Sequence, residues 1–134
     1  MSLIEKRAGY KNKQGAKGEK AAIRYLRFHG YRIKARDVWY PFGEIDIVAT
    51  KANNISFIEV KTRAIEKGDI SRRPADAVNY YKRKRIINAA KAYLKSNPSE
   101  RHPTLDIIEV YLDPKTSKKY KIVHIPSAFD ETGK

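Results

Sequence analysis

The chain contains no cysteine, and its 134 residues include only one methionine and one tryptophan. Without cysteine, disulfide bonds and thiolate zinc sites are excluded. No apolar run approaches the ~20 residues that a membrane-spanning helix needs, and residues 1–7 lack the apolar centre of a signal peptide. These absences predict a soluble, cytoplasmic protein without a membrane partner.

Acidic residues are also scarce relative to basic ones. The chain has 15 Asp and Glu against 29 Lys and Arg, which gives a formal net charge of +14. Such an excess indicates a polyanionic partner, and nucleic acid is the usual one. The alternative is a basic protein whose charge serves solubility alone, and the size of the charge favours nucleic acid.

The length and composition predict one domain. A chain of 134 residues with 41% hydrophobic residues can bury a core of its own. Residues 1–13 are basic and aperiodic, so we expect a flexible arm, which either contacts nucleic acid or has no role. The domain then spans residues 14–129, and residues 130–134 form a tail.

Two strands at the centre of the chain carry charge where apolar side chains are usual. Residues 42–49 and 55–61 predict a hairpin, because both segments are rich in β-branched and aromatic residues and a polar turn joins them. Alternation along each strand decides which side chains share a face. The predicted charged face consists of Glu44, Asp46, Val48, Phe57, Glu59 and Lys61. The predicted opposite face of the first strand consists of Ile45, Ile47 and Ala49.

The turn sets the pairing of the two strands. A two-residue turn at Asn53 and Asn54 would place Asp46 opposite Lys61, and a loop two residues longer would place Asp46 opposite Glu59. Both alternatives bring the two acids and the lysine to one face, whereas a loop of odd length would separate them.

A helix over residues 14–29 places a third acid on a buried face. Ala22, Ile23 and Leu26 form its apolar stripe, and the same spacing includes Glu19. The helix dipole is one explanation for an acid there. The other is that Glu19 points into the same pocket as Asp46 and Glu59. The two explanations remain open at this stage.

Two carboxylates beside a lysine suit a hard cation and a phosphate. Asp46, Glu59 and the backbone carbonyl of Val60 would ligate Mg²⁺ or Mn²⁺, which prefer oxygen ligands. The cation would neutralise the scissile phosphate and activate a water that Lys61 orients. A cross-strand ion pair between Asp46 and Lys61 is the alternative, but it leaves Glu59 and Glu19 unexplained.

The rest of the chain supplies basic surfaces and further strands. A strand over 31–40 precedes the hairpin, a loop over 64–73 follows it, and a helix starts near Pro74 and runs to about Lys95. The apolar stripe of that helix (Ile86, Ala89, Ala90 and Tyr93) extends back to Lys82 and Asn79, which we expect to bring polar groups to the pocket. An inner strand is expected over 105–112 and a last strand over 120–125, and Phe129 is expected to dock from the segment after the last strand. The predicted nucleic-acid contacts are Arg36, Arg63, Arg72, Arg73, Asn79, Lys82, Arg83 and Arg85.

An acid on a helix followed by Asp and by Glu-x-Lys on adjacent strands resembles the PD-(D/E)xK, or restriction-endonuclease-like, nuclease superfamily. More closely, the chain resembles the YraN-like family of small bacterial proteins of uncharacterised function over about residues 14–129. That resemblance rests on Gly18-Glu19-x-Ala21, Gly43-Glu44-Ile45-Asp46, Glu59-Val60-Lys61-Thr62-Arg63 and Ala89-Ala90-x-x-Tyr93-Leu94.

The resemblance implies an α/β sandwich with a mixed sheet of about five strands flanked by helices, similar to archaeal Holliday-junction resolvases. It implies a Mg²⁺-dependent endonuclease that hydrolyses DNA phosphodiesters through Glu19, Asp46, Glu59 and Lys61. A resolvase-like activity needs two active sites and therefore a homodimer. The alternative is a protein of the same fold that binds DNA or RNA with little or no catalysis, because fold alone does not fix activity.

Overall fold

A computed structural model describes residues 12–134 of the chain. Two α-helices, one 3₁₀ helix and five strands make up this part of the chain. In chain order they are α2 (Lys13–Phe28), β1 (Arg32–Tyr40), β2 (Gly43–Lys51), β3 (Asn54–Ala64), η1 (Pro74–Ala77), α3 (Tyr80–Ser96), β4 (His102–Leu112) and β5 (Lys119–Phe129). None of the helices in residues 12–134 is long and apolar enough to cross a membrane.

The first helix agrees with the predicted range to within one residue at each end. The side chain of Asn12 caps α2 by accepting a hydrogen bond from the Gly15 amide at 2.7 Å. The chain leaves the helix through Gly30, whose φ of +86° is in the left-handed region that glycine favours. The predicted arm lies outside the described residues, except for its last two positions, which are the cap and the first residue of α2.

The second helix begins later than predicted. Residues 74–77 form the 3₁₀ helix η1, and α3 starts only at Tyr80. Asn79 adopts an extended conformation and caps α3, because its Oδ1 accepts the amide hydrogen of Lys82 at 2.9 Å. The expectation of one helix from Pro74, with Asn79 on its buried stripe, was therefore wrong, since a side-chain cap starts a new helix at this point.

The five strands form one mixed sheet in the order β1-β2-β3-β4-β5. Strands β3 and β4 are parallel, and the other three pairs are antiparallel. Strand β4 lies inside the sheet, as predicted. Strand β5 is longer than predicted, and Phe129, expected beyond the last strand, ends it by pairing with Leu105.

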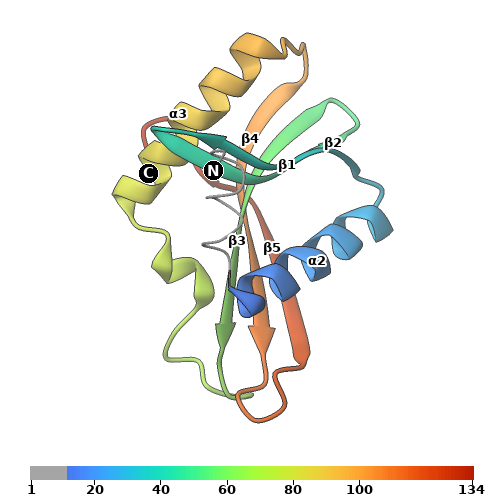
Figure 1. Ribbon diagram of the computed structural model, residues 1–134, viewed down its shortest axis with the longest axis vertical. Helices are drawn as coiled ribbons and strands as arrows, with labels where there is room; N and C mark the ends of the chain where they lie inside the picture. The colour runs from blue at the N-terminus through green and yellow to red at the C-terminus, as the bar shows by residue number, and fades with distance from the viewer. Residues whose placement is uncertain (1–11) are drawn as a thin grey trace, which may run out of the picture.

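The two helices pack on opposite faces of this sheet, as Figure 1 shows. Helix α2 packs on Ile47 and Ile58, and α3 packs on Val48 and Phe57. These layers confirm the predicted α/β fold with a mixed five-stranded sheet, and they are consistent with a restriction-endonuclease-like sandwich.

The turn between β2 and β3 differs from the predicted one. Lys51 pairs with Asn54, so the two-residue turn is Ala52-Asn53, and Ala52 takes a φ of +52°. The ladder ends with Ile47 opposite Ile58. Extended by one residue, this register would place Asp46 opposite Glu59, the second of the two alternatives, but a tight turn one residue earlier sets it rather than a longer loop.

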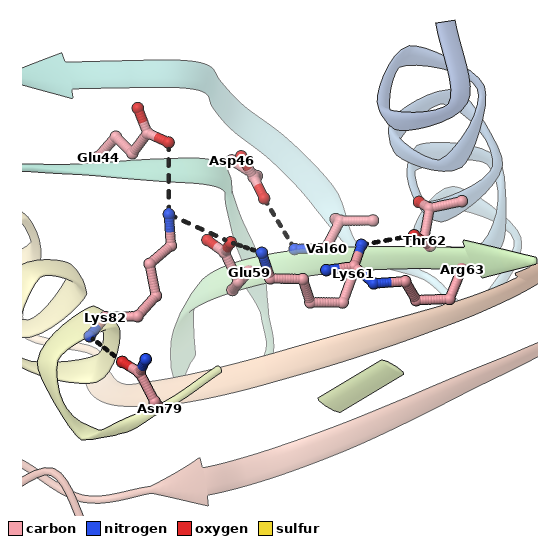
Figure 2. A network of polar contacts seen from close by, with 9 residues as sticks. All are labelled: Glu44, Asp46, Glu59, Val60, Lys61, Thr62, Arg63, Asn79 and Lys82. Atoms are coloured by element: carbon pink, nitrogen blue, oxygen red, sulfur yellow. Dashed lines mark hydrogen bonds and ion pairs between the residues drawn. The ribbon is translucent and has the colours of Figure 1, made fainter. Parts of the chain in front are cut away.

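Alternation along β2 breaks beside Asp46. Ile45 and Val48, three residues apart, lie in the cluster under α3, whereas Ile47 lies in the cluster under α2. The predicted shared face of Ile45, Ile47 and Ala49 was therefore wrong at Ile45. In the neighbouring strand Asp37 has a φ of +48°, so both strands are irregular at the same level. The part of β2 that precedes Ile47 turns away from β3 (Figure 2).

Two acids of the inner strand β4 are buried and hydrogen-bonded. Asp106 accepts a hydrogen bond from the Ser127 amide at 3.0 Å, and its other oxygen lies 2.7 Å from Nε2 of His124. This pair fixes β5 against β4 and gives His124 a structural role. Glu109 has partners of a different kind, described below.

Gly43 is where the β1–β2 turn packs on α3. A β-carbon at this position would overlap the backbone carbonyl oxygen of Arg85. We therefore expect Gly43→Ala to lower the free energy of unfolding by about 2 kcal/mol, a typical cost of overpacking against a backbone that cannot rotate away. Urea denaturation measures this loss, and Lys95→Ala, at an exposed position of the same helix, is the control. A loss no larger than that of the control would contradict the contact.

Candidate active site

A pocket of about 150 Å³ opens where β2 separates from β3. Helix α2, strands β2 and β3, and helix α3 all contribute to its wall. We call it the carboxylate pocket, and its lining residues are Gly15, Glu19, Glu44, Asp46, Glu59, Val60, Lys61 and Lys82. The four residues predicted to be catalytic and the three predicted to ligate a metal therefore all lie at one place.

Asp46 replaces a backbone partner at the end of the ladder. Its Oδ2 accepts the amide hydrogen of Val60 at 2.8 Å (Figure 2). The last regular pair between β2 and β3, counted from the turn that joins them, is Ile47 with Ile58, and Asp46 lies directly beyond it. The hydrogen bond therefore orients the carboxylate and also satisfies an amide that the departing strand leaves behind.

Glu59 is buried between two lysines. Its Oε1 lies 3.7 Å from Nζ of Lys61 and 3.7 Å from Nζ of Lys82. Its Oε2 is buried and has no hydrogen-bond partner among the described residues. Burial, followed by the charge of Asp46, raises the pKa of Glu59 to about 8, although the two lysines act in the opposite direction. This oxygen is a place for a proton or a cation.

Lys82 belongs to the pocket rather than to an outer basic face. Its Nζ lies 3.5 Å from Oε1 of Glu44 and 3.7 Å from Oε1 of Glu59, and it reaches both from the first turns of α3 (Figure 2). The sequence predicted both a place at the pocket and a nucleic-acid contact for Lys82, and the structure bears out the first. Glu44 was placed on the charged face without a role. The ion pair of Lys82 with Glu44 ties α3 to the β2 side of the pocket.

Glu19 points into the pocket from α2. The residue is only 3% exposed, and Arg36 approaches its carboxylate at 4.0 Å. Helix α2 begins at Lys13, so Glu19 lies in the second turn, where the helix dipole has little effect. The neighbouring Gly18 packs directly on Thr62 of β3 and allows the close approach of the helix. The pocket therefore explains the acid better than the dipole does.

Asp37 is an acid at this site that the sequence interpretation missed. One oxygen each from Glu19, Asp37 and Asp46 can be chosen so that all three lie within 4.8 Å of one another, a spacing that could hold a metal ion. In the sequence Asp37 follows a basic strand face and belongs to no spacing pattern. Beside Asp46, the backbone of Asp37 is in the left-handed region, with a φ of +48°. No clear signal in the sequence predicts this conformation.

Comparison with known proteins places the chain in a family. A family model described as "Uncharacterised protein family UPF0102" matches residues 18–110. The chain belongs to this family. A UPF0102 protein of Caldanaerobacter subterraneus subsp. tengcongensis is 40% identical over 116 residues, covering 86% of this chain and 93% of the relative. One of Chlorobaculum tepidum is 41% identical over 120 residues (86% and 90%), and one of Alkaliphilus oremlandii is 42% identical over 120 residues (87% and 97%).

The match to UPF0102 confirms the resemblance to the YraN-like family, and the matched stretch includes every acid and lysine of the carboxylate pocket. The remaining predicted nucleic-acid contacts of this UPF0102 protein lie apart from the pocket lining. Arg63 and Arg72 donate hydrogen bonds to the carbonyls of Thr62 and Ala64, at 2.8 and 3.1 Å, and Arg85 is exposed. Their contact with nucleic acid stays a prediction.

Arg83 and Arg73 hold parts of the UPF0102 fold together. Arg83 donates to the carbonyl of Val78 at 3.0 Å and to that of Gly133 at 3.4 Å, which fastens the C-terminal residues to α3. Arg73 donates to the fully buried Glu109 at 2.8 Å. Nothing in the sequence around either arginine distinguishes a structural partner from a surface contact.

We expect Arg73→Ala to destabilise the protein. Glu109 also accepts hydrogen bonds from the Ala75 amide (3.0 Å) and the Tyr111 hydroxyl (3.2 Å), but Arg73 supplies its counter-charge. Because the arginine side chain is half exposed, water will compensate in part, and we expect a loss of about 1–3 kcal/mol. Thermal and urea unfolding measure it, with Arg72→Ala as the control. Equal stability of the two variants would show that Arg73 is free for another role.

Proposed function

We propose that this UPF0102 protein is a metal-dependent endonuclease of the restriction-endonuclease-like superfamily that hydrolyses DNA phosphodiesters. The observation that carries the proposal is the meeting of Glu19, Asp46, Glu59 and Lys61 in one pocket, with a buried Glu59 oxygen that has no partner among residues 12–134. Clustered carboxylates repel a bare phosphate, so binding an anion alone does not call for them. A phosphate and a cation together do.

The donor set fits a hard divalent cation. Asp46 and Glu59 offer carboxylate oxygens, and Val60, which lines the pocket between them, offers a backbone carbonyl. Mg²⁺ and Mn²⁺ prefer such oxygen ligands and retain waters and substrate phosphates at their other positions. The unpartnered Oε2 of Glu59 is the strongest sign of fit, because a buried carboxylate oxygen without a partner is costly.

The side chains of the pocket divide the work of hydrolysis, in which one water adds across a P–O bond and the leaving oxygen takes a proton. When bound, the cation would neutralise the phosphate and lower the pKa of a water. Lys61, with its ammonium 3.7 Å from Glu59, would position that water or a phosphate oxygen. Asp46 is held in place by Val60, and Lys82 keeps Glu44 and Glu59 paired before a cation enters.

The basic charge of the chain supports nucleic acid as the substrate. The net charge of +14 favours a polyanion in general. Arg36 lies 4.0 Å from Glu19 and is half exposed, so it could contact a phosphate at the edge of the pocket. A resolvase-like version of the activity requires two pockets and therefore a homodimer, which light scattering with and without a four-way junction would detect.

The test is a cleavage assay on supercoiled, single-stranded and four-way-junction DNA with Mg²⁺, Mn²⁺ or EDTA. We expect cleavage of at least one substrate that depends on the cation and stops in EDTA. Competition between DNA and RNA at fixed salt identifies the preferred nucleic acid.

The competing function is nucleic-acid binding without catalysis. The two lysine ammonium groups near Glu59 favour it, because they partly neutralise this carboxylate without any cation. If no substrate is cut under any condition while binding persists, the binding function replaces the nuclease proposal.

A further inference from the structure

Exposed aromatic side chains gather at one side of the carboxylate pocket. In the part of the chain that the structure describes, Phe42 is 45% exposed, Tyr80 is 50% exposed and Tyr81 is 80% exposed. Phe42 lies two residues before Glu44, and both tyrosines directly precede Lys82. Glu44 and Lys82 line the pocket, and their side chains approach each other at 3.5 Å. The three rings therefore belong to the two segments that this ion pair joins.

The β1–β2 turn brings Phe42 to the helix that carries the tyrosines. Gly43 packs on the backbone carbonyl of Arg85, in the second turn of α3. Tyr81 and Arg85 are four residues apart on α3, so they are neighbours on its surface, and both are exposed. Phe42 and Tyr81 thus both lie next to Arg85. We call these three residues the aromatic–basic patch.

Each ring of the patch is supported by a second ring and still faces solvent. Phe42 stacks on Tyr40, with ring centroids 5.3 Å apart and planes inclined by 10°. Tyr40 in turn packs on the hydrophobic cluster under α3. Tyr81 meets Tyr80 edge to face, with centroids 5.8 Å apart. A ring that is already held in place loses little conformational entropy when a flat partner stacks on it.

The charge of the patch identifies the kind of partner. Large apolar side chains that are exposed together mark an interaction site. Arg85 adds an exposed positive charge beside the rings, and the whole chain has a net charge of +14. Rings next to basic side chains suit single-stranded nucleic acid, because bases stack on the rings while cations attract the phosphates. A continuous duplex offers such rings no base faces, since its bases are already stacked on one another.

We propose that the aromatic–basic patch stacks on unpaired bases, so that the substrate of the carboxylate pocket is DNA with a single-stranded segment at or beside the cleaved bond. The inference rests on the proposed function, because it takes DNA as the substrate. Phe42 and Tyr81 supply the stacking surfaces, and Arg85 supplies a cation for the phosphates of the same strand. Stacking accepts every base, so the patch selects strand structure rather than sequence.

The test compares the binding of a single DNA strand with that of the blunt duplex of the same sequence, by fluorescence anisotropy in EDTA. We expect Phe42→Ala and Tyr81→Ala each to lower the affinity for the single strand at least about fivefold, the lower end of what one stacked base contributes. Affinity for the duplex should stay unchanged. The salt dependence of binding should also stay unchanged, because a ring releases no counterions. Phe28→Ala, which removes an 86% exposed ring from the end of α2, is the control and should bind both as the wild type does.

A conservative variant and a direct probe of stacking separate this role from a structural one. Tyr81→Phe keeps the ring and should keep the affinity for the single strand. A 2-aminopurine base in that strand should lose fluorescence on binding to the wild type and to Tyr81→Phe, and keep more of it with Tyr81→Ala. Thermal unfolding confirms that the variants are folded. Equal losses of affinity for single strand and duplex, or no loss in either alanine variant, would overturn the proposal.

The proposed function can fail independently of this inference. Ring-dependent binding of the single strand, without cleavage of any DNA, would leave the stacking surface standing and remove the nuclease. Cation-dependent cleavage that Phe42→Ala and Tyr81→Ala perform at the wild-type rate, with unchanged affinity for the single strand, would leave the nuclease standing and remove the stacking surface.

Discussion

Asp46→Asn is expected to abolish cleavage while nucleic-acid binding persists. Asp46 is a proposed ligand of the cation, and it is held at 2.8 Å from the Val60 amide. Asparagine keeps an oxygen that accepts this hydrogen bond but loses the charge that a cation needs. We expect the cleavage rate to fall at least about 10²-fold, the loss typical of removing one preorganised electrostatic group from an active site.

Binding separates this result from misfolding. Removing a negative charge from a site that faces phosphates should leave the affinity for DNA unchanged or make it tighter. Gel-shift titrations in EDTA measure it, and Glu100→Gln, with the same change of charge in an exposed loop, should leave both cleavage and binding unchanged. Residual cleavage of Asp46→Asn close to the wild-type rate would remove Asp46 from the active site.

Glu59→Gln is expected to change how stability depends on pH. Burial and the nearby Asp46 raise the pKa of Glu59 from 4.5 to about 8 in the folded protein. Between these two values the unfolded chain has lost the proton while the folded protein keeps it. The free energy of unfolding contributed by this group therefore falls as pH rises through the window and is constant above about pH 8. Glutamine does not titrate, so the variant lacks this loss.

Urea denaturation in EDTA at several values between pH 5 and pH 8.5 measures the effect. We expect the stability of Glu59→Gln relative to the wild type to increase with pH, by about 3 to 5 kcal/mol across the full window. A divalent cation, which favours the ionised carboxylate, should stabilise the wild type at pH 8 more than the variant. A difference between the two proteins that stays constant with pH would mean that Glu59 titrates normally.

Much of the pocket follows from side-chain periodicity. Strand alternation placed Glu59 and Lys61 on one face, and helical spacing placed Glu19 on a buried stripe; both are local properties that hold wherever an element is regular. The fold class also followed, because the order of helical and strand patterns, together with the family resemblance, restricts the arrangement of layers.

The missed features all depend on irregular backbone or on contacts distant in sequence. Asp37 lies beside Asp46 where both strands depart from alternation. The stripe of the second helix led correctly to Lys82, but it also led to a buried Asn79, which instead caps the new helix α3. The partnership of Arg73 with Glu109 joins residues 36 positions apart. Periodicity carries no information about such contacts, so the number and identity of the charged groups at the pocket could not be obtained from it.

The unequal pairing of β3 gives the pocket a mechanical property. This strand pairs with β4 along eleven residues but with β2 along only five. Glu59 and Lys61 therefore lie on the rigid part of the sheet, whereas Asp37 and Asp46 lie on the β1–β2 hairpin, which diverges from it. The distance between these two pairs of side chains depends on the angle of the hairpin, and α3 supports the hairpin through the contact of Gly43 with Arg85. Packing of a backbone turn on a helix thus sets the spacing of the charged groups in the pocket.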